Sequence, residues 1–224
     1  MAKSKKLLNK KASLSQEALS QERNRKKSRK EEIIKAASNL FSQKSYHDVT
    51  MDQIAGEVGV AKGTIYLYFE SKENLYLGIL EHTFETIESI LEKEIAKEDP
   101  APQKLKKMLR LVFQFYFQNL DVLRILTRDE TRLIREHYEF TEHWRLRRIK
   151  LYRKILEKGI KEGSFRPANT ELMALIIFGL VGSVMFFYPT DKTAGEIAEE
   201  VFSMISEGIM TTHDESTLGA RGIQ

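Results

Sequence analysis

The sequence has no cysteine, four prolines and one tryptophan among its 224 residues. Without cysteine the chain can form neither a disulfide framework nor a thiolate metal site, so packing alone must stabilise it. We expect no metal and no cofactor. The N-terminal residues offer only Leu7 and Leu8 as an apolar pair, which is too short for a signal peptide. Secretion is therefore not expected, and we predict a cytoplasmic protein.

Long hydrophobic runs are scarce, with one exception at residues 172–188, which carry no charge. Their length is at the lower limit for crossing a bilayer. Pro189 closes the stretch, and small residues interrupt its apolar surface. Gly179 and Ser183 are spaced so that a second helix can approach closely. We interpret the stretch as a helix of a homodimer interface, with Gly179 and Ser183 at the contact, and expect no membrane partner.

Catalytic motifs are also missing. The five histidines are dispersed, and none pairs with another at the i, i+4 spacing of a helical metal site. Lys62-Gly63-Thr64 has the wrong order for a phosphate-binding loop, and no nucleophile elbow is present. A pair of acidic side chains is the one catalytic arrangement that the sequence leaves open. We predict that the protein is not an enzyme and has no catalytic residues.

Charge is unevenly distributed along the chain. Residues 1–30 contain eleven basic and two acidic residues, a net charge of +9, whereas the whole chain carries +4 and the remainder therefore −5. Lysine and arginine release counterions from a phosphate backbone, so a basic segment on a mildly acidic body is typical of a polyanion binder. A solubilising disordered tail is the alternative explanation.

The spacing of apolar residues predicts an all-α protein. Apolar positions recur at helical intervals, with neither strand-like alternation nor an internal repeat. Prolines and glycines divide the pattern. The predicted helices cover approximately residues 28–44, 50–59, 60–69, 71–95, 103–119, 121–128, 129–161, 169–188 and 193–210.

Two of the predicted helices are short and lie on either side of a glycine. Thr50 followed by Gln53 has the form of a capping box, which begins a helix, and Gly59 ends that helix. The next helix directs Ile65 and Phe69 inward and leaves small, polar and aromatic residues outside. This pattern predicts a helix-turn-helix, whose second helix enters the major groove of DNA.

At this point the chain resembles the TetR (tetracycline-repressor) family of transcriptional regulators. Three positions depart from the family pattern: Ser45 replaces a frequent glycine, Val58 a frequent alanine, and Ala61 a frequent serine that caps the recognition helix. The last change removes a cap worth roughly 1 kcal/mol. The resemblance rests on Leu40-Phe41, Thr50, Ile54-Ala55, Gly59-Val60, Lys62-Gly63-Thr64-Ile65-Tyr66, Tyr68-Phe69, Lys72 and Leu75.

The resemblance implies a DNA-binding surface. Thr50, at a helix N-terminus, is expected to offer its hydroxyl and backbone N–H to a phosphate. Lys62 and Thr64 are expected to reach base edges or phosphates, while Gly63 allows a close approach. The alternative is that the tyrosines are partly buried aromatics and the lysines solvated charges. Contacts with the DNA backbone are expected from Tyr66, Tyr68 and Lys72.

The family's second domain is a helical bundle that encloses a small-molecule pocket and dimerises through its last two long helices. Aromatic residues of this chain could line such a pocket, although aromatic residues also dominate ordinary cores. The basic residues between Arg145 and Lys154 favour a solvated face with Glu142 and Glu157 as partners; a rim for an anionic head group is the alternative. The predicted ligand-binding residues are Phe113, Tyr116, Phe117, Trp144 and Phe178.

The resemblance implies a homodimeric regulator, more specifically a repressor, that binds a palindromic operator and is released by a small apolar ligand. A fatty acyl-CoA is the first ligand hypothesis and flat aromatic molecules are the second. The rival functions are a sequence-nonspecific architectural DNA binder and a small-molecule-binding or catalytic bundle with a vestigial head. The predicted organisation is a basic flexible arm at 1–22, a DNA-binding domain at 23–72, a ligand-binding and dimerisation domain at 73–210, and a flexible tail at 211–224.

Overall fold

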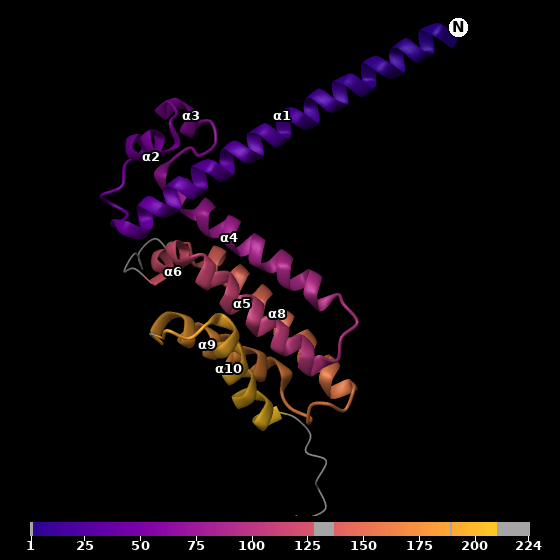
Figure 1. Ribbon diagram of the computed structural model, residues 1–224, viewed down its shortest axis with the longest axis vertical. Coiled ribbons are helices and arrows are strands. Elements are labelled where there is room, and N and C mark those ends of the chain that lie inside the picture. Colours follow the sequence, from indigo (N-terminus) through magenta and orange to yellow (C-terminus); the bar gives the residue numbers. More distant parts are fainter. Residues whose placement is uncertain (1, 128–136, 189, 210–224) are drawn as a thin grey trace, which may run out of the picture. The chain divides into compact units, whose positions relative to one another are not determined.

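The computed structural model describes residues 2–127, 137–188 and 190–209. The described residues form α-helices and no strand, which confirms the all-α prediction. The chain divides into two compact units, Met1–Glu81 and His82–Gln224, whose helices are labelled in Figure 1. The predicted tail at 211–224 lies outside the described residues.

The first unit contains α1 (Ala2–Gln43), α2 (Met51–Val58), α3 (Lys62–Tyr66) and the first turns of α4 (Lys72–Ile95). The predicted capping box is confirmed: the Gln53 backbone N–H donates to Thr50 Oγ1 at 3.2 Å, and the Thr50 N–H donates to Gln53 Oε1 at 3.0 Å. Ser71 caps α4 by accepting from the Asn74 N–H at 3.0 Å. Side-chain caps thus set the starts of two helices.

Helix α1 begins at Ala2, not near Ser28 as predicted, and it runs without interruption to Gln43 (Figure 1). The prediction of a flexible arm at residues 1–22 considered apolar spacing only, and that spacing is absent there. Residues 2–43 contain neither glycine nor proline and include many lysine, leucine, alanine and glutamate residues, which favour helix without a packing partner. Helix propensity therefore extends α1 beyond its apolar face.

The core of the first unit is built around aromatic side chains. Phe41 of α1 meets the Tyr76 ring of α4 edge-on, with ring centroids 5.3 Å apart, and Tyr46 lies 5.4 Å from Tyr76. Ile54 of α2 and Ile65 of α3 are completely buried. Each short helix thus contributes an inward residue to a core that α1 and α4 complete, and this core fixes the orientation of the outer face of α3.

The second unit continues α4 and adds α5 (Ala101–Gln118), α6 (Leu120–Thr127), α8 (Tyr138–Lys161), α9 (Thr170–Phe187) and α10 (Ala194–Ile209). Helix α8 was predicted from about Asp129 but begins at Tyr138. The preceding residue, His137, has a non-helical backbone with φ −112° and ψ 38°. Residues 128–136 lie outside the described part of the chain.

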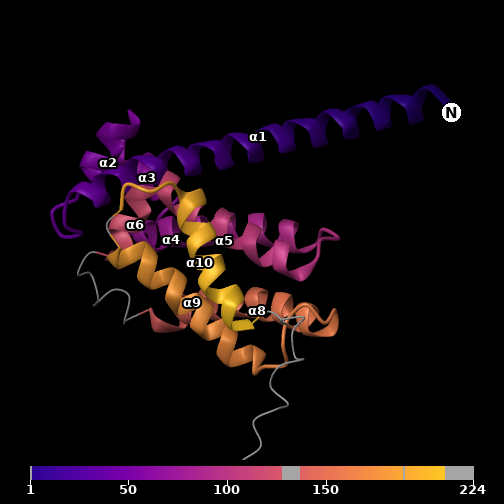
Figure 2. The same cartoon turned by 60° about the horizontal axis from the view of Figure 1, so that its bottom comes forward.

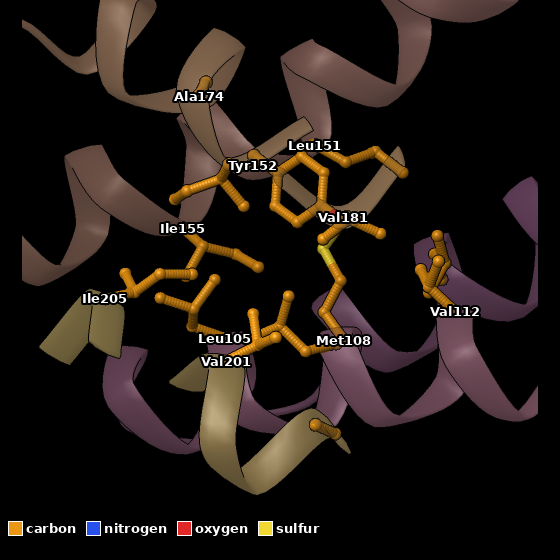
Figure 3. Packing of buried hydrophobic residues seen from close by; sticks show 14 of the residues in the cluster. Leu105, Met108, Val112, Leu151, Tyr152, Ile155, Ala174, Val181, Val201 and Ile205 are labelled. Atoms are coloured by element: carbon orange, nitrogen blue, oxygen red, sulfur yellow. The ribbon is translucent and has the colours of Figure 1, made fainter. Parts of the chain in front are cut away.

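Helix α5 lies at the centre of the second unit and contacts α6, α8, α9 and α10; Figure 2 shows α10 beside it. Side chains from α4, α5, α8, α9 and α10 meet in one cluster, with Leu105 and Met108 of α5 opposite Tyr152 and Ile155 of α8 (Figure 3). Val201 of α10 lies beside Leu105 in this cluster (Figure 3). Burial of these apolar surfaces is the main force that holds the helices together.

Gly159 of α8 has a packing role. A Cβ built on Gly159 would lie 2.0 Å from the Phe165 ring, and Phe165 is buried. The chain turns back immediately after α8 at Gly163, whose φ is 74°. The turn therefore presses the Phe165 ring onto bare backbone, a fit that only glycine permits.

We predict that Gly159→Ala lowers the free energy of unfolding by about 1–3 kcal/mol, because the added methyl group displaces the Phe165 ring. Chemical denaturation monitored by circular dichroism would measure the change. Gly208→Ala in α10 is the matched control, since a Cβ at Gly208 meets nothing within 4 Å; this variant should be neutral or slightly stabilised. Equal stability of the two variants would contradict the packing role.

Candidate DNA interface and effector cavity

The turn between α2 and α3 fixes how the recognition helix is presented. Gly59 ends α2 in the left-handed conformation with φ 73°, which glycine adopts without the strain a side chain would add. The Val60 N–H then donates to the Ala55 carbonyl at 2.9 Å. Ala61 precedes α3 without any side-chain cap, as its departure from the family pattern predicted. The Thr64 N–H instead donates to the Ala61 carbonyl at 2.8 Å, so the first turn of α3 begins on a backbone bond.

Most of the predicted DNA-binding residues lie on the surface of this unit. Lys62 and Gly63 are exposed, and Tyr66 is 44% exposed. Thr64 and Tyr68 are half-buried. Thr50 is exposed although its hydroxyl accepts the capping bond, so its remaining O–H can still donate to a phosphate.

Lys62 joins the two short helices. Its Nζ lies 2.7 Å from Asp52 Oδ2 of α2. The hydrogen bond to Asp52 is the main reason that the pKa of Lys62 is raised above its usual value. The ammonium group is therefore charged at neutral pH but shared with a carboxylate, so a phosphate would have to compete with Asp52 for it.

Gly63 is not explained by the packing of the protein. It lies within α3, where glycine is unfavourable by about 1 kcal/mol relative to alanine. A Cβ at this position would meet nothing within 4 Å. The absence of a side chain leaves the outer surface of α3 open at this point, which agrees with the predicted close approach of DNA.

Lys72 has a structural role that the sequence did not reveal. Its Nζ donates to the carbonyls of Tyr46 at 2.8 Å and Val49 at 2.9 Å, and it lies 4.3 Å from the centre of the Tyr46 ring. The ammonium group therefore holds the connector between α1 and α2 against the start of α4. A phosphate contact remains a prediction for the third donor of this group.

Leu67 is a surface residue that the sequence analysis did not single out. It follows α3 directly and is 82% exposed, between the two tyrosines. An exposed leucine at this point offers an apolar contact of the kind that reads the methyl group of thymine. The spacing of apolar residues could not identify Leu67 as a surface residue, because that pattern predicts that a leucine is buried.

The α1 extension contributes to the same unit. A hollow of about 550 Å³ lies between Tyr68 and α1, where Arg25, Lys26 and Arg29 line it. Two of these basic groups are partly neutralised, since Lys26 pairs with Glu22 at 3.0 Å and Arg29 pairs with Glu32 at 2.6 Å. The basic residues at positions 25–29 of α1 thus lie near Tyr68, which follows α3.

The second unit contains a cavity of about 160 Å³ between α4, α5, α6, α8 and α9. Aromatic and aliphatic side chains form most of its wall, with a few charged groups. This combination is typical of small-molecule sites. The lining residues are Phe84, Glu88, Val112, Tyr116, Leu126, Thr141, Trp144, Arg145, Arg148, Tyr152, Phe178, Val181, Gly182, Met185 and Phe186.

Three of the five predicted ligand-binding residues line this cavity: Tyr116, Trp144 and Phe178. Phe113 and Phe117 do not. Phe113 is completely buried in the central cluster, and Phe117 packs against that cluster. A ligand contact remains a prediction for all five residues, and Phe113 and Phe117 lie in or against the core instead of in the cavity wall.

A buried ion pair forms the polar part of the cavity. Arg148 Nε lies 2.5 Å from Glu88 Oε1; Glu88 is 1% and Arg148 7% exposed. Burial raises the pKa of both neighbouring tyrosines, Tyr116 and Tyr152, so their phenols stay protonated. A buried pair of this kind requires hydrogen bonds on its remaining atoms, since each unsatisfied group costs about 1–3 kcal/mol or more.

The other arginines of α8 are largely paired on the surface. Arg145 pairs with Glu142 at 2.5 Å and Arg153 with Glu157 at 3.1 Å, which confirms both predicted partners. Arg147 pairs with Glu92 of α4 at 3.0 Å. The solvated-face interpretation is therefore the better one, and the basic rim offers an anion fewer free charges than the sequence suggested.

Helix α9 presents an apolar face outward. Only 17% of this apolar helix is buried within the chain, and it passes the length and composition test for a membrane span, which is weak evidence by itself. Leu172 and Ile176 are about half exposed, and they share one helical face with Gly179 and Ser183. A Cβ at Gly179 would meet nothing within 4 Å, so this face is open to a partner.

Comparison with known proteins identifies the family. Residues 33–79 match "Bacterial regulatory proteins, tetR family", and residues 98–209 match "Tetracyclin repressor-like, C-terminal domain". The HTH-type transcriptional regulator YerO of Bacillus subtilis (strain 168) is 31% identical over 187 residues, which make up 80% of this chain and 62% of YerO. The chain thus spans less than two thirds of that relative. It belongs to the TetR family of transcriptional regulators.

Two further similarities agree. The nucleoid occlusion factor SlmA of Aliivibrio fischeri (strain MJ11) is 28% identical over 171 residues, covering 75% of this chain and 87% of SlmA. The crystal structure of the transcriptional regulator FadR from Bacillus subtilis, in complex with stearoyl-CoA, superposes with a TM-score of 0.68 at 21% identity, covering 79% of this chain and 97% of FadR. This structural likeness confirms the fold.

We predict that Gly63→Ala weakens DNA binding at least tenfold while the free energy of unfolding stays equal or rises by up to about 1 kcal/mol. The added methyl group has room within the protein but would collide with DNA. Gly56→Ala in α2 is the matched control, since a Cβ there also meets nothing within 4 Å. Fluorescence anisotropy with labelled DNA would measure both variants. If the two bind DNA equally well, Gly63 does not face the groove.

Proposed function

We propose that this TetR-family regulator is a repressor that binds a palindromic operator as a homodimer and is released by a small, largely apolar effector. The main support for this proposal is the short helix α3 that follows the Gly59 turn. Its exposed residues include Gly63, which internal packing does not require. Two copies would place their α3 helices about one DNA turn, roughly 34 Å, apart. Such a protein would act in the cytoplasm, bound to DNA.

The exposed face of α9 supports the homodimer. Pairing two such faces would bury leucine and isoleucine side chains that are otherwise half exposed, and the helices could approach closely at Gly179 and Ser183. The apolar composition of α9 is then explained by a protein partner. Self-complementary pairing across a two-fold axis also matches the symmetry of a palindromic operator.

The effector is proposed to act through α4. This helix contains Lys72, which holds the connector before α2, and Glu88, which lines the cavity. An effector shifts the population of two conformational states only if it binds one of them more tightly. An effector that prefers one position of α4 would therefore change the position of α3 available to DNA.

Two effector classes follow from the sequence. The fatty acyl-CoA hypothesis is supported by the FadR structure that contains stearoyl-CoA. The cavity, at about 160 Å³, is smaller than the roughly 300–1,000 Å³ of drug-sized sites, so a long acyl chain would require the helices to separate. Flat aromatic molecules need less displacement.

Selection from a randomised DNA pool, followed by footprinting, tests the proposal. A palindromic sequence that binds at least a thousandfold more tightly than bulk DNA would support specific regulation. Binding without sequence preference would favour the architectural alternative, and no binding would favour a bundle with a vestigial head. The selected operator is then titrated with acyl-CoAs of increasing chain length and, separately, with flat aromatic molecules; release by neither class would contradict effector control.

We predict that Gly179→Leu converts the dimer to monomers and weakens operator binding, because the larger side chain separates the paired helices. Sedimentation velocity would measure the oligomeric state. Gln114→Leu is the control, since it adds the same side chain at an exposed position of α5 and should leave the dimer intact. A dimer that survives Gly179→Leu would move the interface away from this face of α9.

A further inference from the structure

The cavity contains one acceptor that the protein leaves without a donor. Arg148 Nε donates to Glu88 Oε1, whereas no hydrogen-bond partner among the described residues reaches Glu88 Oε2, which is buried. Glu88 is 1% exposed and belongs to the cavity wall. A buried carboxylate oxygen of this kind is unfavourable unless something else donates to it.

The size of the cavity limits what that donor can belong to. A volume of about 160 Å³ is close to the roughly 150 Å³ of an apolar protein cavity that accepts benzene. Phe84, Trp144 and Phe178 form apolar walls around the ion pair, and aromatic rings favour edge-to-face and offset contacts with another ring. One substituted ring would therefore fill the space beside Glu88.

We propose that the effector of this protein is a compact, uncharged aromatic molecule whose hydroxyl or N–H group donates a hydrogen bond to Glu88 Oε2. This inference rests on the proposed function, because it names the ligand class of the same cavity. Glu88 would then select the ligand, and Arg148 would hold the carboxylate in position for it.

The charge of the ion pair argues against the other ligand classes. Glu88 and Arg148 balance each other at 2.5 Å, so a cationic ligand would add an unbalanced charge to a buried site. A carboxylate would face Glu88 with acceptors only, and the thioester of an acyl-CoA likewise has no donor at its reactive end. Arg145, the other cation of the wall, is already paired with Glu142. An uncharged donor satisfies Oε2 at the lowest desolvation cost.

The test compares p-cresol with p-methylanisole, which has the same ring but no donor, and with toluene, p-toluate and p-methylbenzylamine. Trp144, the single tryptophan of the chain, lines the cavity, so its fluorescence reports binding directly. The unaltered protein should bind p-cresol at least tenfold more tightly than each of the others, a difference of about 1.4 kcal/mol. Equal affinity for p-cresol and p-methylanisole would overturn the proposal.

Glu88→Gln identifies the responsible atom. Its amide oxygen can keep the Arg148 bond, which places the NH₂ group where Oε2 was and replaces an acceptor with a donor. The preference for p-cresol over p-methylanisole should therefore disappear or reverse. Glu92→Gln is the matched control, one turn further along α4 and paired with Arg147 on the surface; it should retain the preference. A preference that persists in Glu88→Gln would also overturn the proposal.

Two readouts keep this inference separate from the proposed function. If Glu88→Gln does not fold by circular dichroism, the comparison of probes on the unaltered protein still decides the ligand class. Operator release is measured in a parallel titration. Binding of p-cresol without operator release would support the ligand class and contradict effector control, whereas release by acyl-CoA with no binding of p-cresol would do the opposite.

Discussion

The buried contact between Glu88 and Arg148 is the interaction around which the cavity of the second unit is built. It joins α4 to α8 inside an apolar wall, where loss of one partner would leave an uncompensated charge and cost about 3–5 kcal/mol. Moving one helix away from the other would therefore leave a buried charge without its partner. The pair also leaves one carboxylate oxygen available, so the same constraint that holds the helices defines the chemistry of the cavity.

The first unit was largely predictable because its signals are local. The capping box at Thr50 and Gln53, the left-handed Gly59 and the cap at Ser71 each act within four residues, so sequence spacing determines them. The missing cap at Ala61 was predictable for the same reason. In contrast, the long start of α1 was missed because it depends on summed helix propensity rather than on an apolar pattern.

The effector cavity was only partly predictable because its signals are long-range. Glu88 and Arg148 are sixty positions apart in the sequence, and nothing in either local pattern distinguishes them from the many surface charges of the chain. Which of the α5 aromatics reach the cavity, Tyr116 but not Phe113, depends on how α5 is rotated against its neighbours. The hydrogen bonds of Lys72 could not be predicted for the same reason, since the carbonyls of Tyr46 and Val49 come close to it only in the folded chain.

One hydrogen bond and one buried aromatic ring can supply the binding free energy that an effector needs to favour the DNA-released state. A hundredfold preference for the released state corresponds to about 2.7 kcal/mol. Satisfying a buried acceptor contributes about 1–3 kcal/mol, and each CH₂-sized apolar increment that is buried adds about 0.8 kcal/mol. Such energies shift the equilibrium only if Glu88 is available to the ligand in one disposition of α4 and not in the other. Helix α4 contains both Lys72 and Glu88, so the proposal requires the effector to act on this helix.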